Sequence, residues 1–222
     1  MTKPLVLRSV LAAAMLSIAA ACSGGSAPAP QPSEHARYHA TMLSRPIPMP
    51  SAVLTDSRGR PFDLRARTDG YVTLVLFGYT NCPDVCPVHL ANLTAALRQA
   101  GNIPRNQLRV LFITTDPARD TPARLRQWMS HFDHTFIGLT GPKAVLDSLQ
   151  REMQLPVAVK EASNSAGDYA VGHAAQVLVF TRDDRAHLAY PFGTKQQDWV
   201  DDLPRLLKET WGTPGGSSSQ QS

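Results

Sequence analysis

Two cysteines four residues apart are the side chains in this sequence best suited to chemistry. Cys82 and Cys86 occur in the run Cys-Pro-Asp-Val-Cys-Pro, directly after a long apolar stretch. If that stretch is a strand and a helix starts at the cysteines, free backbone N–H groups and the helix dipole favour thiolate over thiol. Side chains four apart on a helix have Cβ atoms about 5–6 Å apart, whereas a disulfide needs about 3.5–4.5 Å. The spacing therefore favours binding of one metal by both sulfurs, without excluding thiol–disulfide exchange.

The number of cysteines narrows the choice of metal. The chain has three cysteines. Cys22 lies far from the pair, and it is the candidate lipidation site described below, so two cysteines remain for a metal. Structural zinc normally takes four ligands and iron–sulfur clusters are usually held by four cysteines, whereas two soft thiolates suit copper(I). The cysteine count therefore favours copper, with an imidazole as a further ligand.

Several histidines are candidates for that imidazole. His89 falls farther into the expected helix than the cysteines, His131 and His134 flank another helix end, and His187 lies in an expected hairpin. His173 closes a polar, flexible stretch at 163–167 and directly precedes an expected strand. A ligand on a flexible loop can open and close a metal site, but the residues alone leave the choice open.

Strand and helix patterns alternate through most of the chain. Apolar runs predict buried strands at 72–77, 108–114, 135–139 and 176–180, and a hairpin partner at 186–190. Helices are expected from the cysteines to about residue 100, and over 121–129, 142–153 and 196–209. Pro204 is expected to kink or split the last helix, and a turn at 56–59 predicts an N-terminal β-hairpin. The result is an α/β domain over 51–211, with a mostly parallel central sheet flanked by helices and an inserted flexible loop. In such sheets, sites collect at the carboxyl ends of strands, where Cys82 lies.

The N-terminus is predicted to be an export signal followed by a tether. Residues 1–21 combine two cations with a short apolar run and small residues, as in a secretory signal. The run Ile-Ala-Ala-Ala-Cys ending at Cys22 resembles a bacterial lipobox, with alanine in place of the usual leucine. Cys22 is therefore the candidate lipidation site, and plain secretion is the alternative. Proline-rich residues 22–50 predict a disordered tether, and residues 212–222 a disordered tail. The domain is thus expected on the exported side, periplasmic or extracellular, of a cell-envelope membrane.

Composition excludes several classes of protein. A hydrophobic content of 43% and 18% charged residues indicate a folded chain. The net charge of +4 includes Lys3 and Arg8, which leave with the signal, and the rest is too small to indicate nucleic-acid binding. The longest apolar run is too short for a membrane span, so the membrane is reached by the lipid anchor alone. No glycine-rich phosphate loop supports nucleotide binding.

Three stretches in order resemble the Sco/SenC family of copper-delivery proteins. They are Phe-Gly-Tyr-Thr with Cys-Pro-Asp-Val-Cys-Pro at 77–87, Asp-Pro-Ala-Arg-Asp-Thr at 116–121, and His173 at the position of the family's ligand histidine. The resemblance implies a thioredoxin-like fold and one copper, Cu(I) or Cu(II), bound by Cys82, Cys86 and His173. It also implies a role in assembling the binuclear copper site of cytochrome c oxidase. The implied partner is the copper-site subunit of that oxidase, with other copper chaperones or a thiol reductant as further candidates.

Two features leave the details of the site open. Gly172 stands where the family commonly has aspartate, which puts the affinity or lability of the site in question. Asp116, Arg119 and Asp120 in the second stretch are either turn residues or supports of the site.

Two functions of different classes compete. The first is a metallochaperone, which is not an enzyme. The second is a thiol–disulfide reductase that keeps the copper-site cysteines of exported proteins reduced. A dithiol at a helix start fits the reductase, but the spacing is Cys-x-x-x-Cys, and no proline precedes the strand at 176–180 where a thioredoxin places its substrate clamp. Related folds host peroxidases, but no motif here supports one.

Overall fold

A computed structural model describes residues 38–101, 103–162 and 168–211. One sheet contains β1 (Thr41–Pro48), β2 (Val53–Asp56), β3 (Pro61–Asp63), β4 (Val72–Gly78), β5 (Leu108–Thr114), β6 (Ile137–Thr140), β9 (Val177–Phe180) and β10 (Arg185–Tyr190). A separate two-stranded sheet contains β7 (Val159–Lys160) and β8 (Val171–Gly172). The helices are α1 (Leu64–Thr68), α2 (Val85–Gln99), α3 (Pro122–Met129), α4 (Lys143–Glu152) and α5 (Gln196–Lys208).

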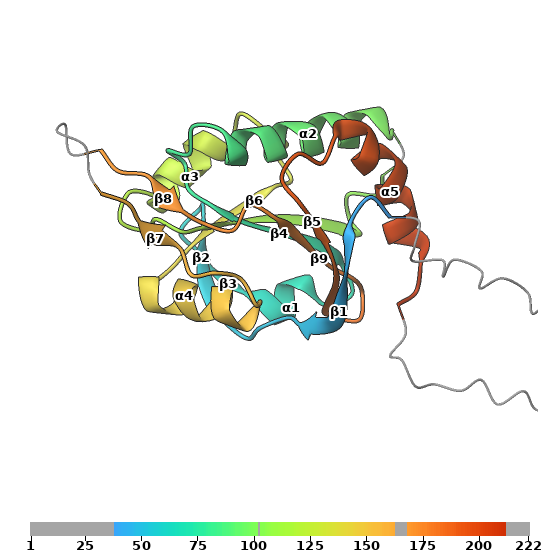
Figure 1. Cartoon of the computed structure of the whole chain (residues 1–222), viewed down its shortest axis with the longest axis horizontal. Helices are drawn as coiled ribbons and strands as arrows, with labels where there is room; N and C mark the ends of the chain where they lie inside the picture. The colour runs from blue at the N-terminus through green and yellow to red at the C-terminus, as the bar shows by residue number, and fades with distance from the viewer. Residues whose placement is uncertain (1–37, 102, 163–167, 212–222) are drawn as a thin grey trace, which may run out of the picture.

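The large sheet is mixed rather than mostly parallel. Its strand order is β1-β10-β9-β4-β5-β6-β2-β3 (Figure 1). Parallel pairing is confined to β4 with β5 and β5 with β6, and the other pairs are antiparallel. The prediction of a mostly parallel sheet is therefore correct for the central strands and wrong for the flanks. Short turns join β2 to β3 and β9 to β10. These pairs are antiparallel because a short turn reverses the direction of the chain, whereas a parallel pair needs a long crossover connection.

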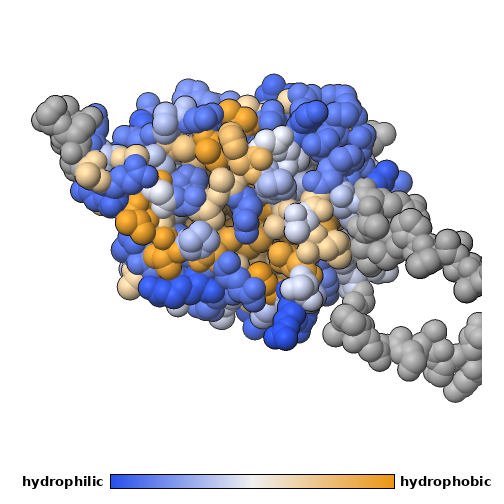
Figure 2. All heavy atoms as spheres, viewed as in Figure 1, coloured by the Kyte–Doolittle hydropathy of each residue, from blue (hydrophilic) through white to orange (hydrophobic). Residues whose placement is uncertain are grey.

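Helices cover both faces of the sheet, as expected for an α/β domain. Side chains of β4 alternate between the two cores: Leu74 and Leu76 pack in the core under α2, α3 and α5, and Val75 and Phe77 pack in the core with α1 and α4. Figure 1 shows α2 and α5 on one side of the sheet and α1 and α4 on the other. On the face drawn in Figure 2, hydrophilic residues dominate the upper and lower rims, and hydrophobic residues reach the surface between them. The buried strand β4 thus leads straight to the cysteines from the centre of the molecule.

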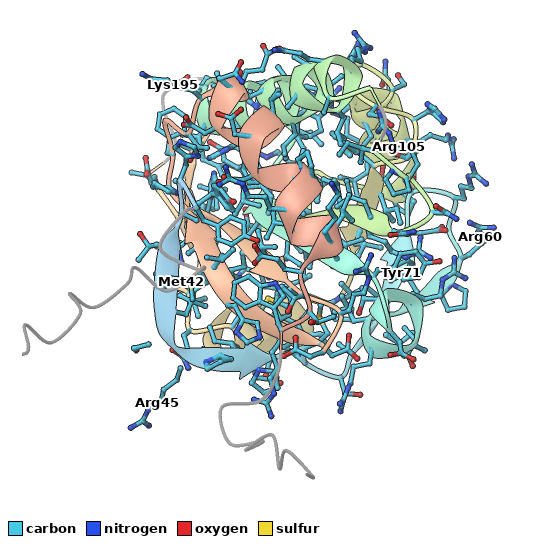
Figure 3. All side chains as sticks on the ribbon, turned by 90° about the vertical axis from the view of Figure 1, so that its right-hand side faces the viewer. Met42, Arg45, Arg60, Tyr71, Arg105 and Lys195 are labelled. Atoms are coloured by element: carbon cyan, nitrogen blue, oxygen red, sulfur yellow. The ribbon has the colours of Figure 1, made fainter. Side chains whose placement is uncertain are left out.

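The folded domain begins earlier than residue 51. Part of the expected tether forms β1, which pairs antiparallel with β10 and buries Ile47. The prolines that favoured a tether are tolerated because β1 is an edge strand. In Figure 3, Met42 and Arg45 of β1 lie on one side of the molecule and Arg60, beside β3, on the opposite side.

Other predictions fall partly or wholly outside the described residues. The signal at 1–21, Cys22, the tether as far as residue 37, the loop at 163–167 and the tail at 212–222 are among them. Within the described ranges, no helix is long and apolar enough to cross a membrane.

The predicted helices are present, with one correction. Helix α5 is continuous through Pro204 and is not split. Its buried face, which includes Trp199, Leu203 and Leu206, packs into the core beside α2, and this tertiary packing outweighs the local cost of proline. Thr121 caps α3 as expected, because its hydroxyl accepts a hydrogen bond from the backbone N–H of Arg124 at 3.2 Å.

Candidate metal site

The two cysteines lie where β4 passes into α2, as the sequence predicts. Strand β4 ends at Gly78, and the backbone N–H of Cys82 donates to the carbonyl of Tyr79 at 3.1 Å in the connecting turn. Cys86 occupies the first turn of α2, and its backbone N–H donates to the Cys82 sulfur at 3.4 Å. Both thiols are free and buried. One cysteine therefore precedes the helix and the other lies within it, with a helix N–H directed at sulfur.

Gly78 provides the space that the Cys86 sulfur occupies. A Cβ atom built on Gly78 would overlap the Cys86 sulfur and would lie 2.8 Å from the ring of Phe112. Any larger residue at the end of β4 must displace that sulfur or the ring. The glycine in Phe-Gly-Tyr-Thr is thus explained by a close approach of backbone and sulfur.

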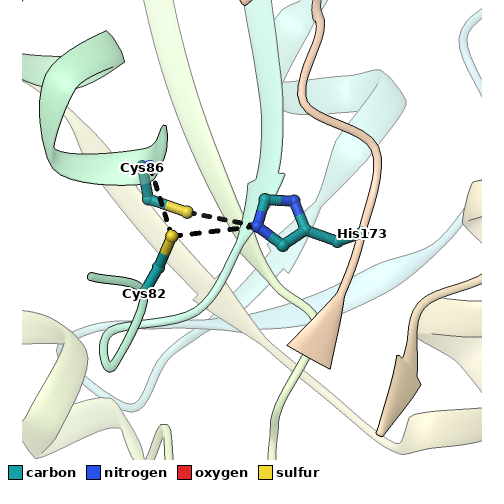
Figure 4. Close-up of side chains that lie close together, drawn as sticks. All are labelled: Cys82, Cys86 and His173. Atoms are coloured by element: carbon teal, nitrogen blue, oxygen red, sulfur yellow. Dashed lines mark hydrogen bonds between the residues drawn. The ribbon is translucent and has the colours of Figure 1, made fainter. Parts of the chain in front are cut away.

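His173 joins the cysteines from a distant part of the chain. Its Nε2 atom lies 3.5 Å from the Cys86 sulfur and 4.0 Å from the Cys82 sulfur (Figure 4). Its Nδ1 lies 2.8 Å from the carbonyl oxygen of Ala174, so Nδ1 carries a proton and Nε2 is the ring nitrogen that faces the sulfurs. Nε2 can donate a proton to a thiolate when the ring is charged, and it can bind a metal once that proton is lost. The donor atoms all lie within 4.8 Å of one another. Donors that bind one metal at about 2.0–2.3 Å each lie up to about 4.5 Å apart, so the arrangement fits a single ion after small movements.

The two thiols differ sharply in acidity. A hydrogen bond from the Cys86 thiol, aided by His173 and the N–H groups of Cys86 and Asp84, lowers the pKa of Cys82 to about 4 against the effect of burial. The same hydrogen bond, together with burial and the Cys82 charge, raises the pKa of Cys86. Burial is the largest single influence on His173 and disfavours its charge, but the hydrogen bonds to Cys82 and to the Ala174 carbonyl and the charge of Cys82 together outweigh burial and raise the pKa of His173. Without metal, the site therefore holds one thiolate beside a protonated thiol, which makes Cys82 the more nucleophilic of the two sulfurs.

Asp120 supports the turn that carries Cys82. Its buried carboxylate accepts hydrogen bonds from the backbone N–H of Thr80 at 3.0 Å, the Thr80 hydroxyl at 2.6 Å and the Thr114 hydroxyl at 2.6 Å. These bonds tie the ends of β4 and β5 together two residues before Cys82. The sequence left open whether Asp120 is a turn residue or a support, and its contacts are those of a support.

Asp116 and Arg119 hold the other side of the site. Asp116 accepts a hydrogen bond from the Tyr169 hydroxyl at 2.9 Å and forms an ion pair with Arg119. The Arg119 guanidinium donates to the Tyr169 carbonyl at 3.1 Å and stacks 3.6 Å from the centre of its ring. Because Tyr169 lies just before β8 and His173, this cluster attaches the histidine segment to the body of the domain.

Aromatic side chains next to His173 were not among the residues that the sequence singled out. Tyr79 presents its ring to His173 edge-on at a centroid distance of 5.7 Å. Tyr169 was not singled out, and its position four residues before His173 is the one signal in its favour. A Cβ placed on Gly172 would lie 3.5 Å from a carboxylate oxygen of Glu161, so an acid from the neighbouring segment approaches the position where the family commonly has aspartate.

The remaining candidate histidines do not join the site. His89 is buried and its Nε2 lies 2.7 Å from the Ala175 carbonyl oxygen, while His187 pairs with Asp183. His131 and His134 are exposed. Only tertiary structure separates His173 from these, because the sequence places His89 nearest to the cysteines.

The fold is thioredoxin-like, and two thiols and one imidazole converge at the end of its central strand. This combination defines a class of proteins that can bind a soft metal ion. The family model described as SCO1/SenC matches residues 49–208, and the chain belongs to this family.

Comparison with known proteins agrees with this membership. A "Putative copper-binding protein" of Stutzerimonas stutzeri is 33% identical over 170 residues, which cover 76% of this chain and 79% of that protein. The mitochondrial protein SCO2 of Saccharomyces cerevisiae is 33% identical over 121 residues, but these cover 54% of this chain and 40% of the yeast protein. The solved structure of Bradyrhizobium japonicum ScoI with copper bound superposes with a TM-score of 0.63 at 31% identity, covering 74% of this chain and 99% of that one. Apo Sco1 of Thermus thermophilus gives a TM-score of 0.67 at 27% identity, covering 76% and 96%.

Proposed function

We propose that this protein is a copper metallochaperone that binds one copper ion through Cys82, Cys86 and His173. The observation that carries the proposal is the convergence of two sulfurs and one imidazole nitrogen within 4.8 Å. Two thiolates select Cu(I) over harder ions, and the imidazole supports Cu(II) as well. The copper-binding name of the Stutzerimonas relative and the copper-bound Bradyrhizobium structure agree with this choice.

Copper is the cargo of this site, and it leaves by ligand exchange. A thiolate of the acceptor replaces one ligand at a time, so that the ion always keeps at least two donors. His173 is the first ligand to leave, because it directly follows the two-residue strand β8 while Cys86 lies within the core.

The proposed acceptor is the binuclear copper site in the copper-site subunit of cytochrome c oxidase. Membership of the SCO1/SenC family supports this destination. The proposed location is a cell-envelope membrane, reached through a lipid on Cys22 after removal of residues 1–21. The lipobox-like run before Cys22 supports the anchor.

Copper titration of the mature chain, which starts at Cys22, tests the proposal. The expected result is one Cu(I) per chain, lost in Cys82→Ser and in Cys86→Ser. His173→Ala retains Cu(I) more weakly and loses Cu(II). The matched control is Cys22→Ser, which removes a cysteine outside the site and leaves the stoichiometry unchanged. Full stoichiometric binding by the Cys82→Ser, Cys86→Ser double variant places the site elsewhere and refutes the proposal.

A thiol–disulfide reductase is the second candidate, because a thiolate with a pKa of about 4 lies next to a protonated thiol. Cys82 would attack a substrate disulfide and Cys86 would resolve the mixed disulfide. Insulin reduction and trapping of mixed disulfides on Cys86→Ser separate the two functions. Vigorous turnover that persists in His173→Ala supports the reductase, whereas slow turnover with tight copper binding supports the chaperone.

A further inference from the structure

An arginine beside the cysteine turn forms no ion pair with any carboxylate of the residues that the structure describes. Arg124 of α3 donates from Nε to the Thr80 hydroxyl at 3.1 Å and from Nη2 to the Asn81 side-chain oxygen at 3.3 Å. Both acceptors are neutral, and Asn81 immediately precedes Cys82. Thr80 is itself fixed by Asp120. The guanidinium is therefore anchored to the cysteine turn by neutral acceptors, which do not neutralise its positive charge.

This arginine lines an open hollow beside Cys82. The hollow has a volume of about 530 Å³, and its lining includes Asn81 and Pro83, the neighbours of Cys82 on both sides. Arg119 and Asp168 also line it. Arg119 is already ion-paired with Asp116, so Arg124 is the cation of the lining that is left to pair with a carboxylate of a bound segment.

We propose that this hollow is the docking site for an acidic segment of the protein that exchanges copper with this one. The inference rests on the proposed function and names the chemistry of the partner: a carboxylate that pairs with Arg124. A guanidinium presents five N–H donors, of which the contacts to Thr80 and Asn81 use a part, and planar carboxylates match its geometry.

The positive charge of Arg124 would also assist the transfer of copper. Exchange of copper between two thiolate pairs brings several negative sulfurs together, and a fixed cation at the rim reduces their repulsion. Complementary charge also raises the rate of encounter more than the final affinity, and salt suppresses the effect. The expected signature is therefore a salt-sensitive preference in rate for acidic partners.

A copper-free reaction tests the docking separately from copper binding. Two synthetic peptides carry the same cysteine as an activated thiopyridyl disulfide, one flanked by glutamates and the other by lysines. The Cys82 thiolate attacks the peptide sulfur, which forms a mixed disulfide and releases pyridine-2-thione with the electron pair of the broken S–S bond. Release is followed by absorbance, and each rate is divided by that of the same peptide with 2-mercaptoethanol to remove intrinsic reactivity.

At low salt, the reduced full chain is expected to react about tenfold faster with the acidic peptide after this correction. Arg124→Glu abolishes or reverses the preference, Arg124→Lys keeps most of it, and about 0.5 M salt removes it. The matched control is Arg126→Glu, an exposed residue of the same helix whose guanidinium donates to the Ser57 carbonyl away from the cysteines. This control is expected to retain the preference.

Equal corrected rates for the two peptides overturn the docking proposal. An equal loss of the preference for the acidic peptide in Arg124→Glu and Arg126→Glu also overturns it, because it shows that the preference comes from the overall charge of the surface rather than from Arg124. Neither result affects the copper stoichiometry. Conversely, failure of the chain to bind copper refutes the metallochaperone and leaves the peptide preference measurable.

Discussion

The two segments that form the metal site are supported very differently. The cysteine segment follows a central strand buried on both faces, and Cys86 is fully buried at the start of α2. The histidine segment follows β8, a strand of two residues whose partner β7 also has two, and Val159 on that arm is 65% exposed. The sulfurs are thus part of the core, whereas the imidazole is held by a few side-chain contacts at its margin.

If the protein carries copper as proposed, this difference assigns affinity and release of the ion to different segments. A rigid pair of sulfurs gives affinity, because little order is lost when the ion binds. A weakly supported imidazole gives release, because it can leave without disturbing the core. Changes in the cysteine segment are therefore expected to affect retention of copper, and changes in the arm are expected to affect the geometry and the oxidation state that it favours.

The largest effect is expected from removing a sulfur. Cys86→Ser lowers Cu(I) affinity by more than about 100-fold, since loss of an outer-shell partner alone costs about 10–100-fold. His173→Ala costs less for Cu(I) but abolishes the Cu(II) spectrum. Competition with a chromophoric Cu(I) chelator and electron paramagnetic resonance measure the two. Equal losses of Cu(I) affinity in both variants contradict the proposed division of labour.

Thiol acidity gives the next largest effect. Because the pKa of Cys82 is lowered to about 4 and that of Cys86 is raised, Cys82 is a thiolate at pH 6 and Cys86 is not. Iodoacetamide at pH 6 is expected to label Cys82 in strong preference to Cys86, and the rate falls only as the pH approaches about 4. Mass spectrometry of the cysteine peptides measures the selectivity. In urea the preference disappears, because both thiols return to a pKa of about 8.5; selective labelling of Cys86 in the folded chain overturns the assignment.

A pair of glycine substitutions compares the two segments directly. Gly78→Ala places a methyl group against the Cys86 sulfur and the Phe112 ring, and is expected to lower the free energy of unfolding by about 1–3 kcal/mol and to weaken Cu(I) binding. Gly172→Ala meets ordinary contacts, the nearest at 3.5 Å, and is expected to change little. Urea denaturation and copper titration of both variants provide the comparison. A larger loss in Gly172→Ala shows that the arm is the more tightly packed segment.

The smallest effect is expected from loosening the arm without touching a ligand. Tyr169→Phe removes the hydrogen bond to Asp116, and the segment before His173 loses about 1 kcal/mol of stabilisation. Affinity for Cu(II) should fall severalfold, while affinity for Cu(I) is nearly unchanged. The control is Tyr71→Phe, whose ring lies under Arg109 away from the site. A matching fall in Cu(I) affinity implies that His173 contributes equally to both oxidation states.

Long buried patterns predicted the fold well, and weak patterns did not. The apolar run of β4 and the cap at Thr121 lead to the observed elements because their local signals agree with the tertiary context. Strand β1 was missed because its prolines and polar residues indicate a tether, and its pairing with β10 becomes visible only when that strand is in place. The sheet was predicted as more parallel than it is, because alternation of strands and helices does not reveal which strands the short turns reverse.

For the site, the sequence by itself determined the cysteine pair, its position at a helix start and its preference for a soft metal, because spacing and residue type act over a single turn of backbone. Only the tertiary structure decided which histidine meets the sulfurs, since His173 lies 87 residues from Cys86 along the chain and His89 is nearer. It also decided that Asp120 supports the cysteine turn while Asp116 and Arg119 hold the histidine arm. Contacts between distant segments depend on how whole strands pack, and no local pattern encodes that packing.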